Sequence, residues 1–311
     1  MKNPLNQYNS HYRYDPEGDI IVDLGEEKKP KKIRIKKINV FLFLGTIITT
    51  VGAGAIYLEN KDIISNPLNL IYGVPYSLAI LFILGAHEMG HYMMCRKHGI
   101  PATLPFFIPA PFLFGTMGAV IKIKGIMKNR KVLFDVGTAG PIAGILATIP
   151  VLIVGIYLSD FQLIPEDKSG YLYFGEPLLF KFLVFLVKGT APANHSLNIS
   201  SIALAGWAGL FVTAMNLIPV GQLDGGHIIY SFSPKNHRMI SKLFTLILIP
   251  LGLIFWHGWI MWALLLIFFV RFNHPNTTFD HVPLDGKRKI IGIITLIIFI
   301  LTFIYQPFYF E

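Results

Sequence analysis

His87, Glu88 and His91 form the pattern H-E-x-x-H within residues 78–97. If this segment is helical, the two histidines lie one turn apart on one face, so both imidazoles can reach one metal ion. The glutamate beside the first histidine can then act as a general base toward a water on that metal. The pattern predicts a hydrolytic metal centre, with His87 and His91 as ligands and Glu88 as the base.

The surroundings of this motif favour a functional interpretation. Residues 78–86, directly before it, are all apolar or glycine. Two histidines and a glutamate buried there without partners would be costly, and ionisable groups at membrane depth usually serve a function. A chance match on a solvated helix face is the alternative for so short a motif.

Asp224 is the predicted third ligand. Catalytic zinc usually takes three protein ligands and keeps one position for water. Asp224 follows an apolar segment, 201–220, that ends at the same depth as the histidine pair. Pro219 and Gly221 break that helix, and Gly225–Gly226 let the backbone turn tightly near the ion. Taken alone, Asp224 would be a solvated helix cap.

The composition indicates an integral membrane protein. Of the 311 residues, 53% are hydrophobic and 14% are charged, whereas soluble proteins carry about 25% charged residues. The net charge of +9 comes from basic blocks that flank apolar segments, which is typical of membrane orientation and not of nucleic-acid binding. The single cysteine, Cys95, excludes an intrachain disulfide and is expected to pack in the interior.

The predicted fold is an all-α membrane protein with about seven transmembrane helices within residues 38–306 and a catalytic core at about 75–230. Residues 1–37 are expected to form a polybasic cytoplasmic tail without a cleavable signal peptide. Residues 307–311 would form a short C-terminal tail. The expected spans are 38–58, 75–97, 134–158, 201–220, 240–256, 258–272 and 289–306.

Residues 99–131 do not resemble a spanning helix, because four prolines interrupt their first part. Residues 121–124 alternate apolar and cationic side chains, as a strand does. The segment is predicted to be a re-entrant β-like loop beside the metal that can pair with an extended peptide. An interfacial loop with its lysines on lipid headgroups is an equal alternative. The residues expected to receive the substrate are Gly115, Thr116, Met117 and Gly118.

With these motifs the chain resembles the site-2 protease family of intramembrane zinc metalloproteases. The resemblance rests on the H-E-x-x-H helix, on Asn216-x-x-Pro219 leading to Leu223–Asp224–Gly225, and on Gly140–Pro141 between them. The sequence around these motifs is most similar to the branch of the family that occurs in bacteria, cyanobacteria and chloroplasts and lacks an inserted PDZ domain. An asparagine that the family often has shortly after the Gly-Pro is absent here, where Ile142, Ala143 and Gly144 follow.

The resemblance implies that His87, His91 and Asp224 bind one Zn²⁺ per chain and that Glu88 is the base. It also implies that Asn216 holds the substrate or the oxyanion. The implied activity is hydrolysis of a peptide bond in or near the transmembrane segment of a membrane-protein substrate, which must unwind locally to expose its amides.

The expected partners are transmembrane substrates and the lipid bilayer, without nucleic acid, and the oligomeric state is not predicted. The N-terminus lacks a transit-like Ser/Arg bias, which favours a bacterial cell membrane over a plastid one. Two other functions compete. A metal-ion transporter or sensor would leave Glu88 without a role and would often show duplicated halves, which the sequence lacks. An inactive scaffold would not need the intact motif.

The remaining histidines are expected to be ordinary. Those in predicted loops should be solvated or interfacial, while His227 either orients Asp224 or has a structural role. The loop histidines are His98, His195, His237, His274 and His281.

Overall fold

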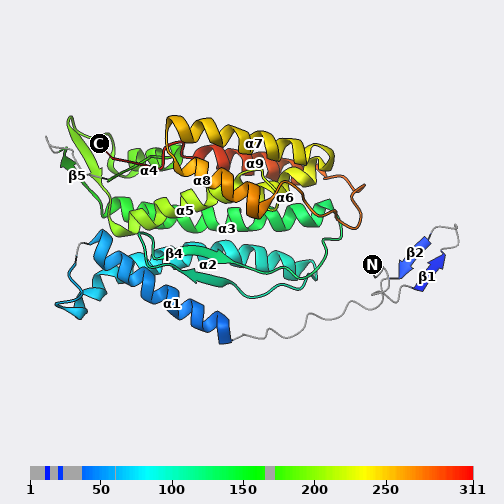
Figure 1. The fold of residues 1–311 in the computed structure, drawn as a ribbon, viewed down its shortest axis with the longest axis horizontal. Coiled ribbons are helices and arrows are strands. Elements are labelled where there is room, and N and C mark those ends of the chain that lie inside the picture. The colour runs from blue at the N-terminus through cyan, green and yellow to red at the C-terminus, as the bar shows by residue number, and fades with distance from the viewer. Residues whose placement is uncertain (1–10, 15–19, 24–36, 60, 165–171, 311) are drawn as a thin grey trace. The chain divides into compact units, whose positions relative to one another are not determined.

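The computed structural model describes residues 11–14, 20–23, 37–59, 61–164 and 172–310. The chain forms two separate units, Met1–Arg34 and Ile35–Glu311. In the first unit, strands β1 (His11–Tyr14) and β2 (Ile20–Asp23) pair antiparallel (Figure 1). The lysine-rich block between residues 28 and 36, predicted to be part of the tail, lies outside the described residues.

The second unit is mostly helical. Helix α3 packs against α2, α5 and α6, and therefore lies at the centre of the bundle (Figure 1). A π-helical turn continues α1 to Leu58, a 3-10 turn from Pro67 precedes α2, and a second π turn continues α8 to Val270. The helices are α1 (Lys37–Ala53), α2 (Val74–Lys97), α3 (Arg130–Tyr157), α4 (Leu178–Lys188), α5 (Ser201–Leu217), α6 (Asp224–Phe232), α7 (Pro234–Ile254), α8 (Gly258–Leu265) and α9 (Gly286–Thr302).

Several helices begin earlier than predicted, because capping residues and not the apolar pattern set their first turns. The Asn129 side chain accepts the N–H of Val132 (3.0 Å), so α3 begins at Arg130 and not at residue 134. The Asp285 side chain accepts the N–H of Arg288 (3.1 Å), so α9 begins before residue 289. Pro234 at the first helical position starts α7 ahead of residue 240.

Among the residues that the structure describes, four helical segments are long and apolar enough to cross a membrane. Helices lie at all seven predicted positions, but α5 and α9 have 17 residues each. At 1.5 Å per residue such a helix is about 25 Å long, shorter than a hydrocarbon core of about 30 Å. Seven spans therefore stays a prediction. The four segments are Lys37–Ile56, Pro67–Lys97, Arg130–Tyr157 and Pro234–Ile254.

A β-hairpin replaces helix between α2 and α3, as the prolines suggested. Strands β3 (Phe106–Pro109) and β4 (Thr116–Val120) pair antiparallel, with Phe107 opposite Ala119. The strand lies earlier than the alternating residues 121–124, of which Ile123 forms an isolated bridge with Ala102. The position of this hairpin relative to a bilayer stays a prediction.

Helix α1 holds the hairpin in place. The Asn39 amide donates to the carbonyls of Leu104 (3.2 Å) and Pro105 (3.1 Å). The Thr49 hydroxyl donates to the carbonyl of Gly115 (2.6 Å). Gly115 has a φ of +70°, and a Cβ there would lie 2.5 Å from the Cα of Thr50, so only glycine fits this approach.

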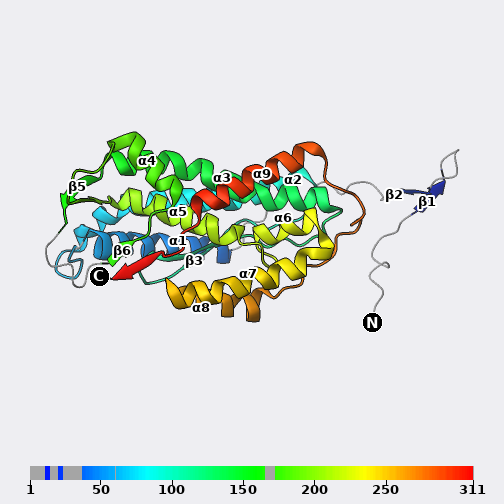
Figure 2. The same cartoon turned by 90° about the horizontal axis from the view of Figure 1, so that it is seen from above.

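Two further strand pairs connect segments outside the helices of the second unit. Strand β5 (Asp160–Leu163) pairs with β7 (His195–Asn198), and β6 (Leu172–Phe174) pairs with β8 (Phe308–Phe310) (Figure 2). Strand β8 lies within the predicted C-terminal tail, which is therefore not a simple tail. It is held there because Phe308 packs against aromatic side chains that include Trp207 of α5.

Candidate metal centre

The site is built where α2 and α3 cross at very short range. A Cβ on Gly90 of α2 would lie 2.4 Å from the carbonyl oxygen of Ala139 in α3. A Cβ on Gly140 would lie 2.0 Å from Nε2 of His91, and one on Gly144 would lie 3.0 Å from Nδ1 of His87. The small-residue face of α3 around Gly140–Pro141 is therefore the wall against which both imidazoles pack.

Three donor atoms converge at this crossing. Nε2 of His87 and Nε2 of His91 are 3.2 Å apart, and each lies 3.3 Å from Oδ2 of Asp224. His87 and His91 are 4% and 7% exposed, and the Asp224 side chain is 13% exposed. The structure thus brings together the three residues that the sequence predicted to be ligands.

Asp224 reaches the histidines because a short helix begins at it. The sequence suggested a tight turn at Gly225–Gly226, but these residues lie in the first turn of α6. A Cβ on Gly225 would lie 2.0 Å from the carbonyl oxygen of Leu217, at the end of α5. The glycines therefore serve a close approach of α6 to α5, and the actual turn lies at Gly221, whose φ is +54°.

The backbone of α3 orients the His91 ring. Nδ1–H of His91 donates to the carbonyl of Val136 (2.8 Å). Because Nδ1 carries the proton in this bond, the lone pair of Nε2 faces His87 and Asp224. Metal-binding histidines almost always make such a second hydrogen bond. Sequence reasoning did not find this contact, because a backbone acceptor leaves no residue-type signal.

Glu88 is buried beside the donors, with 7% exposure. The backbone N–H of Ile121, directly after β4, lies within hydrogen-bonding reach of its carboxyl group. A carboxyl group that is buried next to a metal centre, and is not one of its three convergent donors, is suited to accept and return a proton. The contact also joins the β-hairpin to the site.

Asn216, in the last turn of α5, also lies at the site. Its side-chain Nδ2 is 3.3 Å from Nε2 of His87. An amide donor in this position can serve a substrate oxygen near the metal.

The four residues predicted to receive substrate differ in accessibility. Gly115 is fixed against α1, and the Thr116 hydroxyl donates to the carbonyl of Ile108 in β3 (2.9 Å). Met117 is 70% exposed, and Gly118 is half-buried with a φ of +101°. Met117 and Gly118 are therefore the accessible part of the predicted set.

Several histidines that were predicted to be solvated or interfacial make polar contacts in the structure. His98 bonds to Oδ2 of Asp135 (2.9 Å), and His237 is 2% exposed with Nε2 3.1 Å from the Gly221 carbonyl. Nε2 of His274 is 2.7 Å from Nδ1 of His227. The prediction is wrong for His237, which is buried because it lies in α7 and packs against Tyr230 and His274. For His98 and His274, which are partly exposed, an interfacial position stays a prediction.

Cys95 is fully buried, as predicted, among apolar side chains that include Ile100 and Val136. It takes no part in the metal group. Helix α4 has Leu178, Phe182 and Leu186 exposed along it.

The donor set fits a zinc ion. Zinc bonds of about 2.0–2.1 Å in tetrahedral geometry separate the ligand atoms by about 3.3 Å, and the three donors are 3.2–3.3 Å apart. Two imidazoles and one carboxylate are also a usual ligand set of catalytic zinc. Together, the fold and the site define an integral membrane protein with a buried site for a metal ion.

Comparison with known proteins identifies the class. The family model of peptidase family M50 matches residues 75–257, more than half of the chain. The chain therefore belongs to peptidase family M50, which confirms the predicted relation to site-2 proteases. No solved structure matches the chain significantly.

Several curated relatives carry zinc metalloprotease names. The chain is 29% identical to "Probable zinc metalloprotease EGY2, chloroplastic" of Arabidopsis thaliana, over 76% of this chain and 43% of the relative. The EGY2 protein of Oryza sativa subsp. indica is 31% identical over 77% of this chain and 44% of the relative. "Probable zinc metalloprotease EGY1, chloroplastic" of Arabidopsis thaliana is 28% identical over 93% and 57%. The chain spans about half the length of these relatives.

Proposed function

We propose that this protein is an intramembrane zinc metalloprotease that hydrolyses a peptide bond in or near the transmembrane segment of membrane-protein substrates. The observation that carries the proposal is the convergence of His87, His91 and Asp224 on one point, with the Glu88 carboxyl group buried beside them. Membership of peptidase family M50 and the names of the relatives support it.

The residues divide the chemistry among them. His87, His91 and Asp224 would hold a zinc ion, which would supply Lewis acidity toward the scissile carbonyl and lower the pKa of water at the site. Glu88 accepts the proton of the attacking water and passes it to the departing amine. Asn216 donates a hydrogen bond to the substrate oxygen on which negative charge develops.

The β-hairpin receives the substrate. A transmembrane helix hides its amides in its own hydrogen bonds, so the cleaved segment must become extended. Strand β4 presents Met117 and Val120, 70% and 50% exposed, and its next residue, Ile121, contacts Glu88 through its N–H. An extended peptide added along β4 would therefore run toward the base.

The membrane arrangement is also proposed. Seven helices, near residues 38–306, cross the bilayer with the N-terminus and the polybasic tail 1–37 in the cytoplasm, and the catalytic core covers about 75–230. The proposed location is a bacterial cell membrane. Because the relatives are named chloroplastic, a plastid membrane is the alternative. The substrates are other transmembrane proteins.

The test is a Glu88→Gln variant, purified as the full chain in detergent and assayed with a membrane-spanning reporter. We expect wild type and variant to bind one zinc per chain and only wild type to cleave. Glu176→Gln is the control, because this carboxylate pairs only loosely with Lys181 (3.8 Å) and is 51% exposed. Undiminished cleavage by Glu88→Gln would refute the proposed base. Zinc uptake into vesicles by that variant without reporter cleavage by wild type would favour a transporter.

A further inference from the structure

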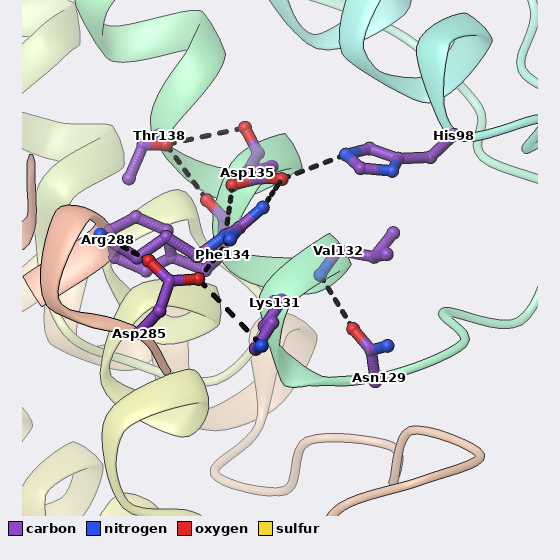
Figure 3. A network of polar contacts seen from close by, with 9 residues as sticks. All are labelled: His98, Asn129, Lys131, Val132, Phe134, Asp135, Thr138, Asp285 and Arg288. Atoms are coloured by element: carbon purple, nitrogen blue, oxygen red, sulfur yellow. Dashed lines mark hydrogen bonds and ion pairs between the residues drawn. The ribbon is translucent and has the colours of Figure 1, made fainter. Parts of the chain in front are cut away.

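A cluster of charged side chains connects the ends of three helices (Figure 3). Asp135, in the second turn of α3, accepts two hydrogen bonds from Arg288 of α9, from Nε to Oδ1 (2.8 Å) and from Nη2 to Oδ2 (2.6 Å). Oδ2 of Asp135 is also 2.9 Å from Nε2 of His98, the residue that caps α2. One carboxylate thus joins α2, α3 and α9.

This cluster is built as a rigid group. The Asp135 and Arg288 side chains are 14% and 25% exposed, so water screens the pair only in part. The two parallel bonds give a bidentate geometry, which fixes direction as well as distance. Arg288 also bonds to Asp285, which caps α9 and lies 3.9 Å from Nζ of Lys131. The charges of the cluster therefore balance.

The cluster adjoins the element that orients the metal ligands. Val136, whose carbonyl accepts the Nδ1–H of His91, is the residue after Asp135. Gly140, one turn further along α3, leaves the space in which the His91 ring lies. A helix moves as one body over so short a distance. Holding Asp135 in place therefore also holds the Val136 carbonyl and the face of α3 at Gly140 in place.

The glycine face of α3 explains why a separate contact must hold this helix in position. The His91 and His87 rings of α2 pack against Gly140 and Gly144, so the register of α3 along α2 decides where both rings lie. A shift of α3 by a few tenths of an ångström would change the donor triangle. The Asp135 carboxylate, held from both α2 and α9, sets that register.

We propose that Asp135 and Arg288 are positioning residues for the metal centre, acting through α3 on His91. This inference rests on the proposed zinc site. Arg288 lies beyond residues 75–257, the part that matches the family model, so the charged cluster includes a helix outside the matched region. A lone acidic residue in α3, together with the basic start of α9, is the sequence signal that could have indicated it.

The test measures metal binding and not only cleavage. The full chain is purified as wild type, Asp135→Asn, Arg288→Gln and Arg288→Lys, and zinc affinity is determined by competition with a chelator. We expect affinity to fall about 10-fold in Asp135→Asn and Arg288→Gln, the lower end of the effect of removing groups that orient metal ligands. Arg288→Lys should lose less zinc affinity than Arg288→Gln, because lysine keeps the positive charge but cannot form the two parallel hydrogen bonds of arginine.

Two further measurements separate positioning from simple stabilisation. The visible spectrum of the Co²⁺-loaded protein should change in Asp135→Asn, because it reports the arrangement of the ligands. Lys188→Gln is the matched control, since it removes an ion pair with Asp160 (3.7 Å) whose acidic side chain is 84% exposed. Folded Asp135→Asn and Arg288→Gln variants with wild-type zinc affinity and Co²⁺ spectrum would overturn the inference, even if they unfold more easily. Wild type that binds no zinc would instead refute the proposed function.

Discussion

His91 and Val136 are joined by a hydrogen bond of 2.8 Å between an imidazole Nδ1–H on α2 and a backbone carbonyl on α3. The bond leaves Nε2 of the same ring directed at Asp224, 3.3 Å away. Helix α3 therefore contributes none of the three convergent donor atoms, yet its backbone orients the ring that carries one of them. The first prediction tests this dependence on α3.

Gly140→Ala should abolish tight zinc binding. Its Cβ would lie 2.0 Å from Nε2 of His91, the atom that faces the other donors, so the ring or the backbone of α3 would have to shift. We expect zinc affinity to fall by about 100-fold or more, the upper end of what disturbing the surroundings of a ligand costs. Gly144→Ala should cost less, since its nearest atom is Nδ1 of His87 at 3.0 Å. Chelator competition measures both.

Gly52→Ala in α1 is the control for these substitutions. A Cβ at Gly52 meets nothing within 4 Å, and alanine raises helix propensity by about 1 kcal/mol. This variant should keep wild-type zinc affinity and equal or greater thermal stability. If Gly140→Ala binds zinc as tightly as Gly52→Ala, the short α2–α3 approach is not required for the site.

Asn216→Ala should reduce turnover without removing the metal. The Asn216 amide lies 3.3 Å from Nε2 of His87, but the three proposed ligands do not depend on it. Removing one donor to a developing oxyanion typically lowers kcat by about 10²–10³-fold. Zinc stoichiometry and reporter cleavage are measured together, with Asn198→Ala in β7, before the start of α5, as the control. Loss of zinc in Asn216→Ala would show a structural role instead of a role toward substrate.

The cluster of donor atoms could be predicted from the sequence because its residues carry strong local signals. The i, i+4 histidine spacing and an acidic residue after an apolar segment identified His87, His91 and Asp224, and the structure brings their donor atoms together. The prolines between α2 and α3 likewise indicated non-helical backbone, which is the β3–β4 hairpin.

Contacts between distant segments were not predictable in the same way. The bond between Asp135 and Arg288 joins residues 153 positions apart. The lone acidic residue of α3 and the basic start of α9 indicate this pair only once both helices are placed side by side. Helix α6 was expected as a turn, because Gly225 and Gly226 favour turns unless close packing requires them. Buried histidines such as His237 looked like loop residues, since only the assembled helices enclose them.

Asp285 should make stability depend on pH in the acidic range. The Arg288 backbone N–H, together with its guanidinium group, lowers the pKa of the Asp285 carboxyl below its ordinary value. Because the folded state lowers this pKa, the charged cap stabilises fully above the unfolded value of about 3.9 and less as pH falls through the lower folded value. The unfolding temperature of Asp285→Asn should lie below that of wild type at pH 7, and this difference should shrink below about pH 4.

Asparagine is a suitable replacement because it keeps a side-chain oxygen that can cap α9 and removes only the charge. Thermal unfolding in detergent at a series of pH values gives the comparison. A difference between wild type and Asp285→Asn that stays constant from pH 7 to pH 3 would mean that the Asp285 charge does not stabilise the folded state.

A cysteine at Met117 should cross-link to a trapped substrate. Met117 is 70% exposed on β4, whereas Cys95, the single native cysteine, is fully buried and should not react. We expect a disulfide between Met117→Cys and a cysteine near the scissile bond of the reporter, formed in the Glu88→Gln background so that the substrate persists. Ile64→Cys is the control, because residue 64 is 93% exposed but lies in the loop between α1 and α2. Equal cross-linking at the two positions would mean that substrate does not lie along β4.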